Sequence, residues 1–362
     1  MKRILIYSTG IVVGLPSLAL IGLLFFLQFT EYNPALIEPV TAKGKGRPLP
    51  ADKTEFSFLT WNVGYAGLGS GMDYFFDGGG TVRSGKAEME KYFQGISREL
   101  KSSDTLDFMY IQEIDRDCKR TYRQDQQSGI EAALPEYCSA FALNYVVKFI
   151  PVPFSEPIGK VNAGLCTFSR YPPENSERHA YDAYFCWPKR LLWLKRCFIC
   201  SAFTVCGGKQ LILVNLHNSA YDETGELRRK ELDILQTYLQ REYQKGNYII
   251  IGGDWNMNPK EFNQKKINSG DKTFSIQYSL DDNFMPGWKA VYDPLLPTNR
   301  NLDAPYQKGK TGTTIIDFFV ISPNVEVLTC FTADRGFANS DHNPVFAKFR
   351  LQTGNQKGNS SF

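Results

Sequence analysis

Residues 248–256 read Tyr-Ile-Ile-Ile-Gly-Gly-Asp-Trp-Asn, and this stretch decides how the rest of the chain is interpreted. Four apolar or aromatic residues that favour β-structure lead into two glycines and then into Asp254 and Asn256. This pattern is typical of a buried strand that presents polar side chains at its C-terminal end. Gly, Asp and Asn are also the ordinary residues of tight turns, so the meaning of the stretch depends on the rest of the chain.

The composition is that of a globular protein. The chain has 362 residues, of which 43% are hydrophobic and 22% charged, so it can bury a sizeable core in one large domain or two ordinary ones. The net charge of +3 and the sequence pI of about 8.3 are only mildly basic. Charge therefore neither requires nor excludes a nucleic-acid partner.

Residues 4–29 contain no charged side chain, and Lys2 and Arg3 precede them. A run of this length is sufficient to cross a bilayer, and a positive flank favours a cytoplasmic N-terminus. We therefore expect residues 1–30 to be a cytoplasmic start and a single transmembrane helix, with the remaining chain on the extracytoplasmic side of the cell membrane. A cleaved signal peptide and a buried soluble helix are the alternatives.

The remaining chain divides by composition into three parts. Residues 31–54 are rich in Pro and Gly and are expected to be a linker, residues 55–351 a folded domain, and residues 352–362 a polar tail. The eight cysteines permit disulfides outside the cytoplasm, and the other interpretation is small buried thiols with one or two bridges among Cys186, Cys197, Cys200 and Cys206. Cys197 and Cys200 have CxxC spacing, but no second Cys or His pair nearby would complete a zinc site.

Polar residues occur where the expected strands end. Short β-type runs are expected at 56–61, 106–111, 210–216, 248–253, 313–321 and 345–349, with helices at 84–102 and 223–245. Such ends can converge on one cleft in an open sheet. The residues concerned are Asn62, Glu113, His217, Asp254 with Asn256, Asp341 with His342, and Asp317 inside the otherwise apolar strand 313–321.

These residue types favour hydrolysis of a phosphoester. Glu113 with Asn62 and Asp341 offers the oxygen ligands that Mg²⁺ prefers. Asp254 and Asn256 could hold a water, and two of the three histidines of the chain stand in the motifs. Each residue alone also has a purely structural interpretation, as a turn residue, a rim charge or a core histidine. The absence of cysteine from the set disfavours redox and zinc-peptidase chemistry.

The ordered set of motifs resembles the endonuclease/exonuclease/phosphatase family, which has the deoxyribonuclease-I-like fold. The resemblance spans residues 55 to 350, and the motifs occur in the order of the family. They are Thr60-Trp61-Asn62-Val63, Ile111-Gln112-Glu113-Ile114, Asn162 to Arg170, Asn215-Leu216-His217-Asn218, Gly253-Asp254-Trp255-Asn256, Ile316-Asp317-Phe318-Phe319, and Ser340-Asp341-His342-Asn343-Pro344-Val345. The resemblance implies an α/β fold: a four-layer α/β sandwich with two packed mixed β-sheets.

The resemblance also implies roles for the residues. Glu113 and Asn62 would bind Mg²⁺, or Mn²⁺, with Asp341 near it. Asp254 would activate or orient the attacking water, and Asn256 would bind the phosphate. Asp317 would pair with His342, and His217 would contact the scissile phosphate as an acid or a hydrogen-bond donor.

The substrate class stays open at this point. Members of the family cleave nucleic acids, sphingomyelin and phosphoinositides, so the expected phosphodiester substrate is nucleic acid or a phospholipid or sphingomyelin headgroup. Residues 145–157 and 181–200 are rich in aromatic and basic residues, which suits a membrane interface, single-stranded nucleic acid or core packing. Residues 65–80 are expected to be a mobile loop near Asn62. A non-catalytic phosphate- or lipid-binding protein is the alternative, and no protein partner is implied.

Overall fold

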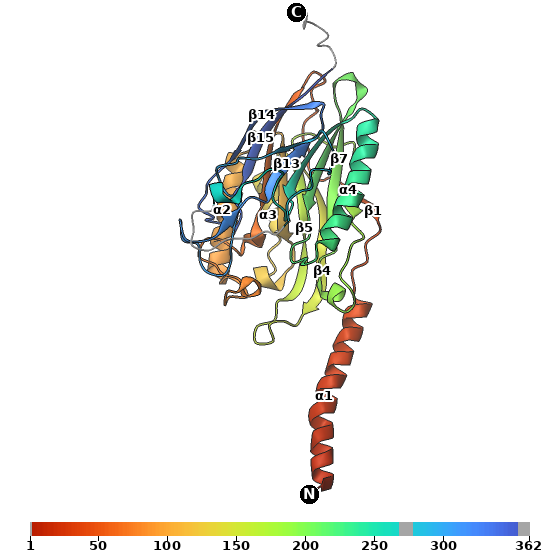
Figure 1. The fold of residues 1–362 in the computed structure, drawn as a ribbon, viewed down its shortest axis with the longest axis vertical. Coiled ribbons are helices and arrows are strands. Elements are labelled where there is room, and N and C mark those ends of the chain that lie inside the picture. The colour runs from red at the N-terminus through yellow and green to blue at the C-terminus, as the bar shows by residue number, and fades with distance from the viewer. Residues whose placement is uncertain (1, 268–277, 354–362) are drawn as a thin grey trace, which may run out of the picture.

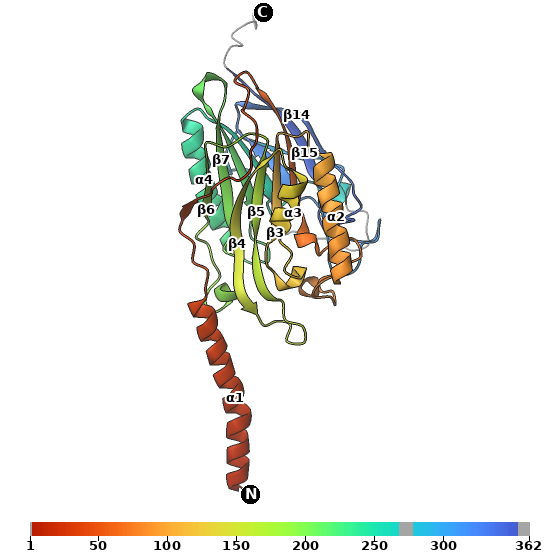
Figure 2. The same ribbon diagram turned by 180° about the vertical axis from the view of Figure 1, so that it is seen from behind.

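Two β-sheets packed face to face form the centre of the molecule (Figures 1 and 2). The computed structural model describes residues 2–267 and 278–353, with side chains from Gly14 onward. The first sheet has seven strands in the order β1-β6-β7-β8-β9-β13-β10. Their bounds are Ile37–Pro39 (β1), Asn175–Ala180 (β6), Cys197–Thr204 (β7), Gln210–His217 (β8), Tyr248–Asp254 (β9), Asp317–Ile321 (β13) and Lys289–Val291 (β10).

The second sheet has six strands in the order β14-β15-β2-β3-β5-β4. Their bounds are Val325–Thr332 (β14), Val345–Leu351 (β15), Glu55–Asn62 (β2), Phe108–Asp115 (β3), Gly159–Ser169 (β5) and Cys138–Ile150 (β4). Both sheets are mixed, because β8 and β9 are parallel, as are β2 and β3, whereas the other pairs are antiparallel. Two short strands, Asn299–Arg300 (β11) and Thr313–Thr314 (β12), pair separately.

Helices cover the outer faces of the two sheets, so the expected α/β sandwich of two mixed sheets is confirmed. Helix α4 (Glu226–Gln244) packs on the seven-stranded sheet through Leu235 and Leu239. Helix α2 (Lys86–Ser102) packs on the six-stranded sheet through Ile96 and Leu100, and α3 (Gln126–Ala133) lies beside it. A third apolar cluster, rich in aromatic side chains, fills the space between the sheets.

The sequence of β9 shows why it lies at the centre. Ile249 and Ile251 face the core under α4, whereas Ile250 faces the core between the sheets, so both faces of the strand are apolar and buried. At Gly252 a Cβ would lie 2.7 Å from the Phe319 ring, which leaves no room for a side chain. At Gly253 the backbone φ of +146° favours glycine, and a Cβ would lie 2.0 Å from the Leu216 carbonyl oxygen. The two glycines therefore permit close packing just before Asp254.

The single strand expected at 313–321 is wrong, because the structure divides it into β12 and β13. Ile315 and Ile316 lie between the two strands, and the backbone N–H groups of Ile316 and Asp317 both donate to the Thr298 hydroxyl, at 3.0 and 3.1 Å. The Ile316 carbonyl accepts from the Trp255 N–H at 2.9 Å. Asp317 therefore starts β13 instead of interrupting a longer strand.

The segment expected to be a linker, residues 31–54, is held against the domain. Strand β1 extends the seven-stranded sheet by pairing with β6, and Lys43 forms a bridge with Ser139. The Arg47 N–H donates to the Arg170 carbonyl oxygen at 2.7 Å. This segment therefore adds an edge strand to the domain. Of the expected polar tail, residues 354–362 lie outside the described residues.

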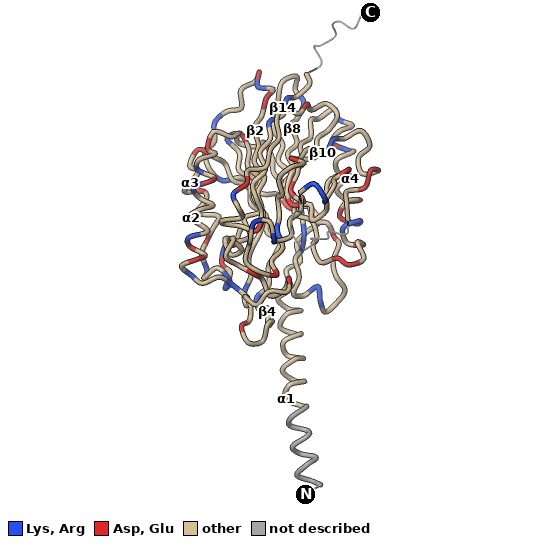
Figure 3. Tube along the Cα trace, turned by 60° about the vertical axis from the view of Figure 1, so that its left-hand side comes forward, with Lys and Arg blue, Asp and Glu red and all other residues tan. Residues whose placement is uncertain are grey.

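Helix α1 (Lys2–Phe29) projects from the domain at the end where β4 finishes (Figures 1 and 2). Its last turns pack on the domain through Leu23, Leu24 and Leu27, which contact the cluster around Ile150 and Leu191. The side chains from residue 14 to residue 29 include no charge, as Figure 3 shows. In the part of the chain that the structure describes, no helix is sufficiently long and apolar to cross a membrane. The beginning of the expected span, residues 4–13, lies outside the residues whose side chains are described. All eight cysteines are free thiols, so none of the possible disulfides is formed.

Candidate active site

The ends of neighbouring strands bring the expected site residues together. In the seven-stranded sheet His217 at the end of β8 is in register with Asp254 at the end of β9, and Asp254 is in register with Asp317 at the start of β13. In the facing sheet Asn62, the last residue of β2, is hydrogen-bonded across to Asp254. Residues far apart in the sequence thus meet where neighbouring inner strands of the two sheets begin or end.

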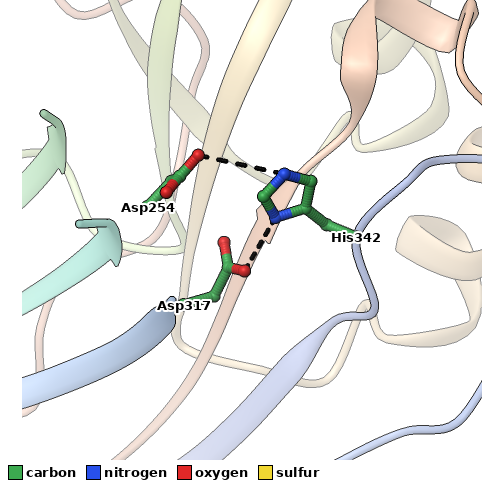
Figure 4. A group of neighbouring side chains, drawn as sticks. All are labelled: Asp254, Asp317 and His342. Atoms are coloured by element: carbon green, nitrogen blue, oxygen red, sulfur yellow. Dashed lines mark hydrogen bonds and ion pairs between the residues drawn. The ribbon is translucent and has the colours of Figure 1, made fainter. Parts of the chain in front are cut away.

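Asp317, His342 and Asp254 form the buried centre of the site (Figure 4). His342 Nδ1 donates to Asp317 Oδ2 at 2.7 Å, and His342 Nε2 lies 3.9 Å from Asp254 Oδ2. The predicted pairing of Asp317 with His342 is therefore present. Burial alone would lower the pKa of His342, but the carboxylates of Asp317 and Asp341 raise it to about 10. At neutral pH, His342 is a proton donor facing the cleft.

Asn299 also contacts His342, and sequence reasoning missed it. Its Nδ2 lies 2.9 Å from His342 Nε2 and 3.3 Å from the Asp341 carbonyl oxygen. In this orientation the ring nitrogen accepts a hydrogen bond, whereas the protonated ring needs the amide turned so that its oxygen accepts instead. Asn299 belongs to the two-residue strand β11, which has no apolar pattern or motif that could have indicated it.

Three neighbours hold the Asp254 carboxylate. Oδ1 accepts from the Asn256 backbone N–H at 2.9 Å, and Oδ2 accepts from Asn62 Nδ2 at 3.0 Å and lies 3.3 Å from His217 Nε2. Burial, followed by the negative charge of Asp317, raises the pKa of Asp254 to about 7. A carboxyl group with a pKa near neutrality is suited to accept a proton from a substrate or a water.

His217 is neutral in this environment. Burial lowers its pKa well below the ordinary value, and the positive charges of Arg196 and His342 act in the same direction. Its Nδ1 is buried and has no hydrogen-bond partner in the described chain. Of the two roles expected for His217, the environment therefore favours the hydrogen-bond donor over the acid.

The expected metal ligands, Asn62, Glu113 and Asp341, surround the same space. Glu113 is about a quarter exposed, with 27% of its side chain accessible, and has a positive φ of 57°. Burial raises the pKa of Asp341 to about 6, and the charge of Glu113 adds to that effect. Asn62 donates from Nδ2 to Glu113 at 3.1 Å, while its Oδ1 accepts from the Gly64 N–H at 2.9 Å. In this orientation the Asn62 amide nitrogen bridges the carboxylates of Glu113 and Asp254. The Asn62 oxygen, which would have to bind the metal ion, already accepts the Gly64 N–H.

A second group of residues could also hold a metal ion. The ligand atoms of Asp254, Asp317 and His342 all lie within 4.8 Å of one another. The short hydrogen bond between Asp317 and His342 already places a proton between two of these ligands, so a cation there would have to displace it. We therefore favour Glu113 and Asp341, both of which line the cleft, as the oxygen donors for a divalent cation.

Asn256 lies at the border of the site. Its backbone has a φ of 50°, and its Nδ2 donates to the Asn218 carbonyl oxygen at 2.9 Å. The second hydrogen of that amide stays available for a ligand, because no other bond of Asn256 Nδ2 occurs in the described structure. The predicted phosphate contact is therefore sterically compatible with this position.

The site opens into a cleft of about 820 Å³. The segment 65–80, expected to be a mobile surface loop, forms part of the wall of this cleft. Hydrogen bonds fix the segment to the domain, because the Arg300 guanidinium donates to the carbonyl oxygens of Leu68, Gly69 and Met72. Sequence reasoning also missed this arginine. The aromatic and basic stretch 181–200 also contributes Lys189, Trp193 and Arg196 to the lining, and Trp193 contacts Phe76 of segment 65–80.

Comparisons with known proteins agree with this architecture. No curated protein matches the sequence significantly. Solved structures with a similar fold include the endonuclease/exonuclease/phosphatase from Beutenbergia cavernae DSM 12333, with a TM-score of 0.54 and 15% identity over 83% of this chain and 72% of that one. ANGEL2, a 2',3'-cyclic phosphatase, has a TM-score of 0.52 and 13% identity over 83% and 96% of the two chains. D. rerio TDP2 complexed with single strand DNA product has a TM-score of 0.50 and 14% identity over 83% and 100%.

Identities this low show a likeness of fold alone. The model of the Endonuclease/Exonuclease/phosphatase family matches residues 59–342, a range that contains all eight expected site residues, from Asn62 to His342. The chain belongs to the Endonuclease/Exonuclease/phosphatase family.

Proposed function

We propose that the protein is a Mg²⁺-dependent phosphodiesterase, which hydrolyses a phosphoester bond by attack of water on phosphorus. The observation that carries this proposal is the buried Asp317–His342 pair, 2.7 Å apart, whose Nε2 lies 3.9 Å from the carboxylate of Asp254. A proton donor and a proton acceptor side by side in one cleft are what hydrolysis of a phosphodiester requires. A non-catalytic binding protein would not need this charged and costly arrangement.

The donor set fits a hard divalent cation. Glu113, Asp254 and Asp341 place carboxylates around one space, and the raised pKa values of Asp254 and Asp341 reflect burial and crowding of like charges. Oxygen donors of this kind suit Mg²⁺ or Mn²⁺, with Glu113 and Asp341 as holders and Asn62 positioning Glu113. When bound, such a cation supplies Lewis-acid stabilisation of the negative charge on the phosphoryl oxygens.

The side chains around the cleft have separate roles in the hydrolysis. Asp254 orients the attacking water and accepts its proton, and Asn62 and the Asn256 N–H fix the carboxylate in place. His342 donates a proton or a hydrogen bond to the phosphoryl group. Asp317 orients the His342 ring and stabilises its positive charge. His217 and the Asn256 amide donate hydrogen bonds to the non-bridging oxygens.

Nucleic acid is the first candidate substrate. Phe76, Trp193 and Tyr221 come from three separate segments and form an edge-to-face cluster on the cleft wall, with ring centroids 5.0 to 6.2 Å apart. Aromatic side chains beside a phosphodiester site suit the stacking of bases. D. rerio TDP2, which has the same fold, was crystallised with a single strand DNA product.

A phospholipid or sphingomyelin headgroup is the second candidate. Apolar residues Ile150, Val152 and Leu192 line the cleft and belong to the cluster on which the end of α1 packs. We propose that residues 4–29 attach the chain to the cell membrane, with the domain on the extracytoplasmic side. The charge-free run and the preceding Lys2 and Arg3 support this proposal. Carbonate extraction of membranes and digestion of the domain by protease added to intact cells would test it. Release by carbonate, or a domain that external protease cannot reach, would contradict it.

The activity test uses the full-length protein and bis(p-nitrophenyl) phosphate. We expect hydrolysis with Mg²⁺, its loss in EDTA, and its loss in the variants Asp254→Ala and His342→Ala, whereas Asp233→Ala, an exposed acid of α4, should act as the parent. Equal rates in the parent and His342→Ala would overturn the proposal. Parallel assays with single-stranded DNA and with sphingomyelin vesicles would then separate the two substrate classes.

A further inference from the structure

Arg196 is a buried arginine on the wall of the cleft. It directly precedes β7, its exposed fraction is 6%, and it lines the same cleft as His217 and Asp254. The neighbouring Lys195 forms an ion pair with Glu31 at 2.6 Å and so is neutralised within the chain. Arg196 forms no ion pair among the described residues, although its positive charge acts on the buried Glu231 carboxyl and opposes the rise that burial causes in the pKa of that group.

The guanidinium of Arg196 has no partner in the described structure. Its Nε and Nη1 are buried without a hydrogen-bond acceptor, and no ion pair involves it among the described residues. Arginine stays charged at all pH values that proteins tolerate, so burial cannot be relieved by loss of its proton. A buried and unpaired charge of this kind is costly, which indicates that its counter-ion is a ligand.

The other buried arginines show the contrast. Arg178 donates to the carbonyl oxygens of Leu143 and Lys195, at 2.9 and 3.0 Å. Arg228 and Arg300 likewise donate to backbone carbonyls, so these three guanidinium groups serve to hold the fold. In Arg196, Nε and Nη1 have no acceptor in the part of the chain that the structure describes.

The other cations of the cleft are also engaged. Arg120 pairs with Asp115 at 2.9 Å, and Lys189 lies over the rings of Phe185 and Trp193, at 3.6 and 4.6 Å from their centroids. The carboxylates on the floor of the cleft lie near His342 and Asn62, and none of them is within ion-pair distance of Arg196 in the described structure. Arg196 is therefore the guanidinium with donors available for an incoming anion.

We propose that Arg196 is the phosphate-binding arginine of this cleft, which pairs with the non-bridging oxygens of the phosphodiester beside His217. The planar guanidinium fork offers two parallel N–H groups, which match two oxygens of one phosphate group. This proposal rests on the proposed function for the identity of the anion, and it adds a phosphate contact that none of the sequence motifs contains. It also explains why a charge is retained in a position where an apolar side chain would cost less.

The test measures binding of inorganic phosphate to the full-length protein by isothermal titration calorimetry. Arg196→Met should weaken phosphate binding by about tenfold to a hundredfold, and Arg196→Lys, which keeps the charge without the fork, should weaken it less. Arg190→Met is the matched control, because it removes the same charge from the same segment but from a half-exposed residue that pairs with Glu31 at 3.5 Å. Its phosphate affinity should stay within about twofold of the parent.

Thermal unfolding without phosphate provides a second measurement. Because Nε and Nη1 of Arg196 make no hydrogen bond to any described residue, Arg196→Met should unfold at the same temperature as the parent or at a higher one. Phosphate affinity of Arg196→Met within about twofold of the parent would overturn the proposal. A clearly lower unfolding temperature would also overturn it, because it would reveal a structural partner. If phosphate binding depends on Arg196 but the protein hydrolyses no phosphodiester, the anion-binding role of Arg196 is supported. Only the proposed function is then refuted.

Discussion

Replacing Asp317 with Asn tests the buried pair at the centre of the site. The exchange removes one negative charge 2.7 Å from His342 Nδ1, while the amide oxygen of Asn can still accept the Nδ1 hydrogen. The rise of the His342 pKa from 6.5 to about 10 corresponds to roughly 5 kcal/mol of preference for the imidazolium. Since burial lowers this pKa while Asp341 and Asp254 still raise it, we expect Asp317→Asn to lower the His342 pKa below that of the parent.

The chain has only three histidines, so their titration can be followed individually by NMR of the imidazole protons. His179 lies outside the cleft, pairs with Glu177 at 3.0 Å and serves as the internal reference. In the parent His342 should stay protonated throughout neutral pH, and in Asp317→Asn it should lose its proton at a clearly lower pH than in the parent. The rate of phosphodiester hydrolysis should fall by about 10²- to 10⁴-fold, the usual contribution of a positioned acid.

Two results would refute this reasoning. His342 titrating at the same pH in the parent and in Asp317→Asn would show that Asp317 does not hold its charge. A double variant Asp317→Asn with His342→Ala that is much slower than His342→Ala alone would show that the two residues act independently.

Three further perturbations have defined expected outcomes. Glu113→Gln should raise the Mg²⁺ concentration needed for half-maximal activity by at least about tenfold; an unchanged requirement would exclude Glu113 as a ligand. Burial raises the pKa of Glu231 to about 7, so the folded state favours its protonated form, and up to about 3 kcal/mol of stability should be lost as pH rises from about 4.5 to about 7. Urea unfolding should show this loss in the parent and not in Glu231→Gln. Trp255→Ala, which removes a buried ring stacked on Phe318 at 4.9 Å, should cost about 3 to 5 kcal/mol in the same assay, whereas the exposed Trp187→Ala should cost almost nothing.

Much of the fold follows from local sequence patterns. The apolar run 248–251 and the two glycines after it predict a buried strand, and β9 has those bounds with Asp254 as its last residue. Helices α2 and α4 also follow from their apolar spacing, to within three residues at each end. The convergence of Asn62, Asp254 and His342 could be predicted because each ends, follows or closely precedes a strand-like run.

The rest depends on contacts between distant segments, which no local pattern encodes. The strand expected at 313–321 is divided in two because the Thr298 hydroxyl, from another segment, accepts hydrogen bonds from the N–H groups of Ile316 and Asp317. Asn299 lies 2.9 Å from His342 Nε2 because a β-bridge joins these two residues, which are 43 positions apart in the sequence. The Pro-rich segment after α1 joins the sheet as β1, since its partner β6 leaves an edge free for it. The unpaired state of Arg196 likewise becomes visible only when its surroundings are known.

Hydrolysis in H₂¹⁸O tests the central claim most directly. Full-length protein would be incubated with bis(p-nitrophenyl) phosphate and Mg²⁺, and the two products would be analysed by mass spectrometry. If water oriented by Asp254 attacks phosphorus, the heavy oxygen should appear in p-nitrophenyl phosphate, and Asp254→Asn should form almost no labelled product. Heavy oxygen in p-nitrophenol, or equal labelling by Asp254→Asn and the parent, would contradict the account.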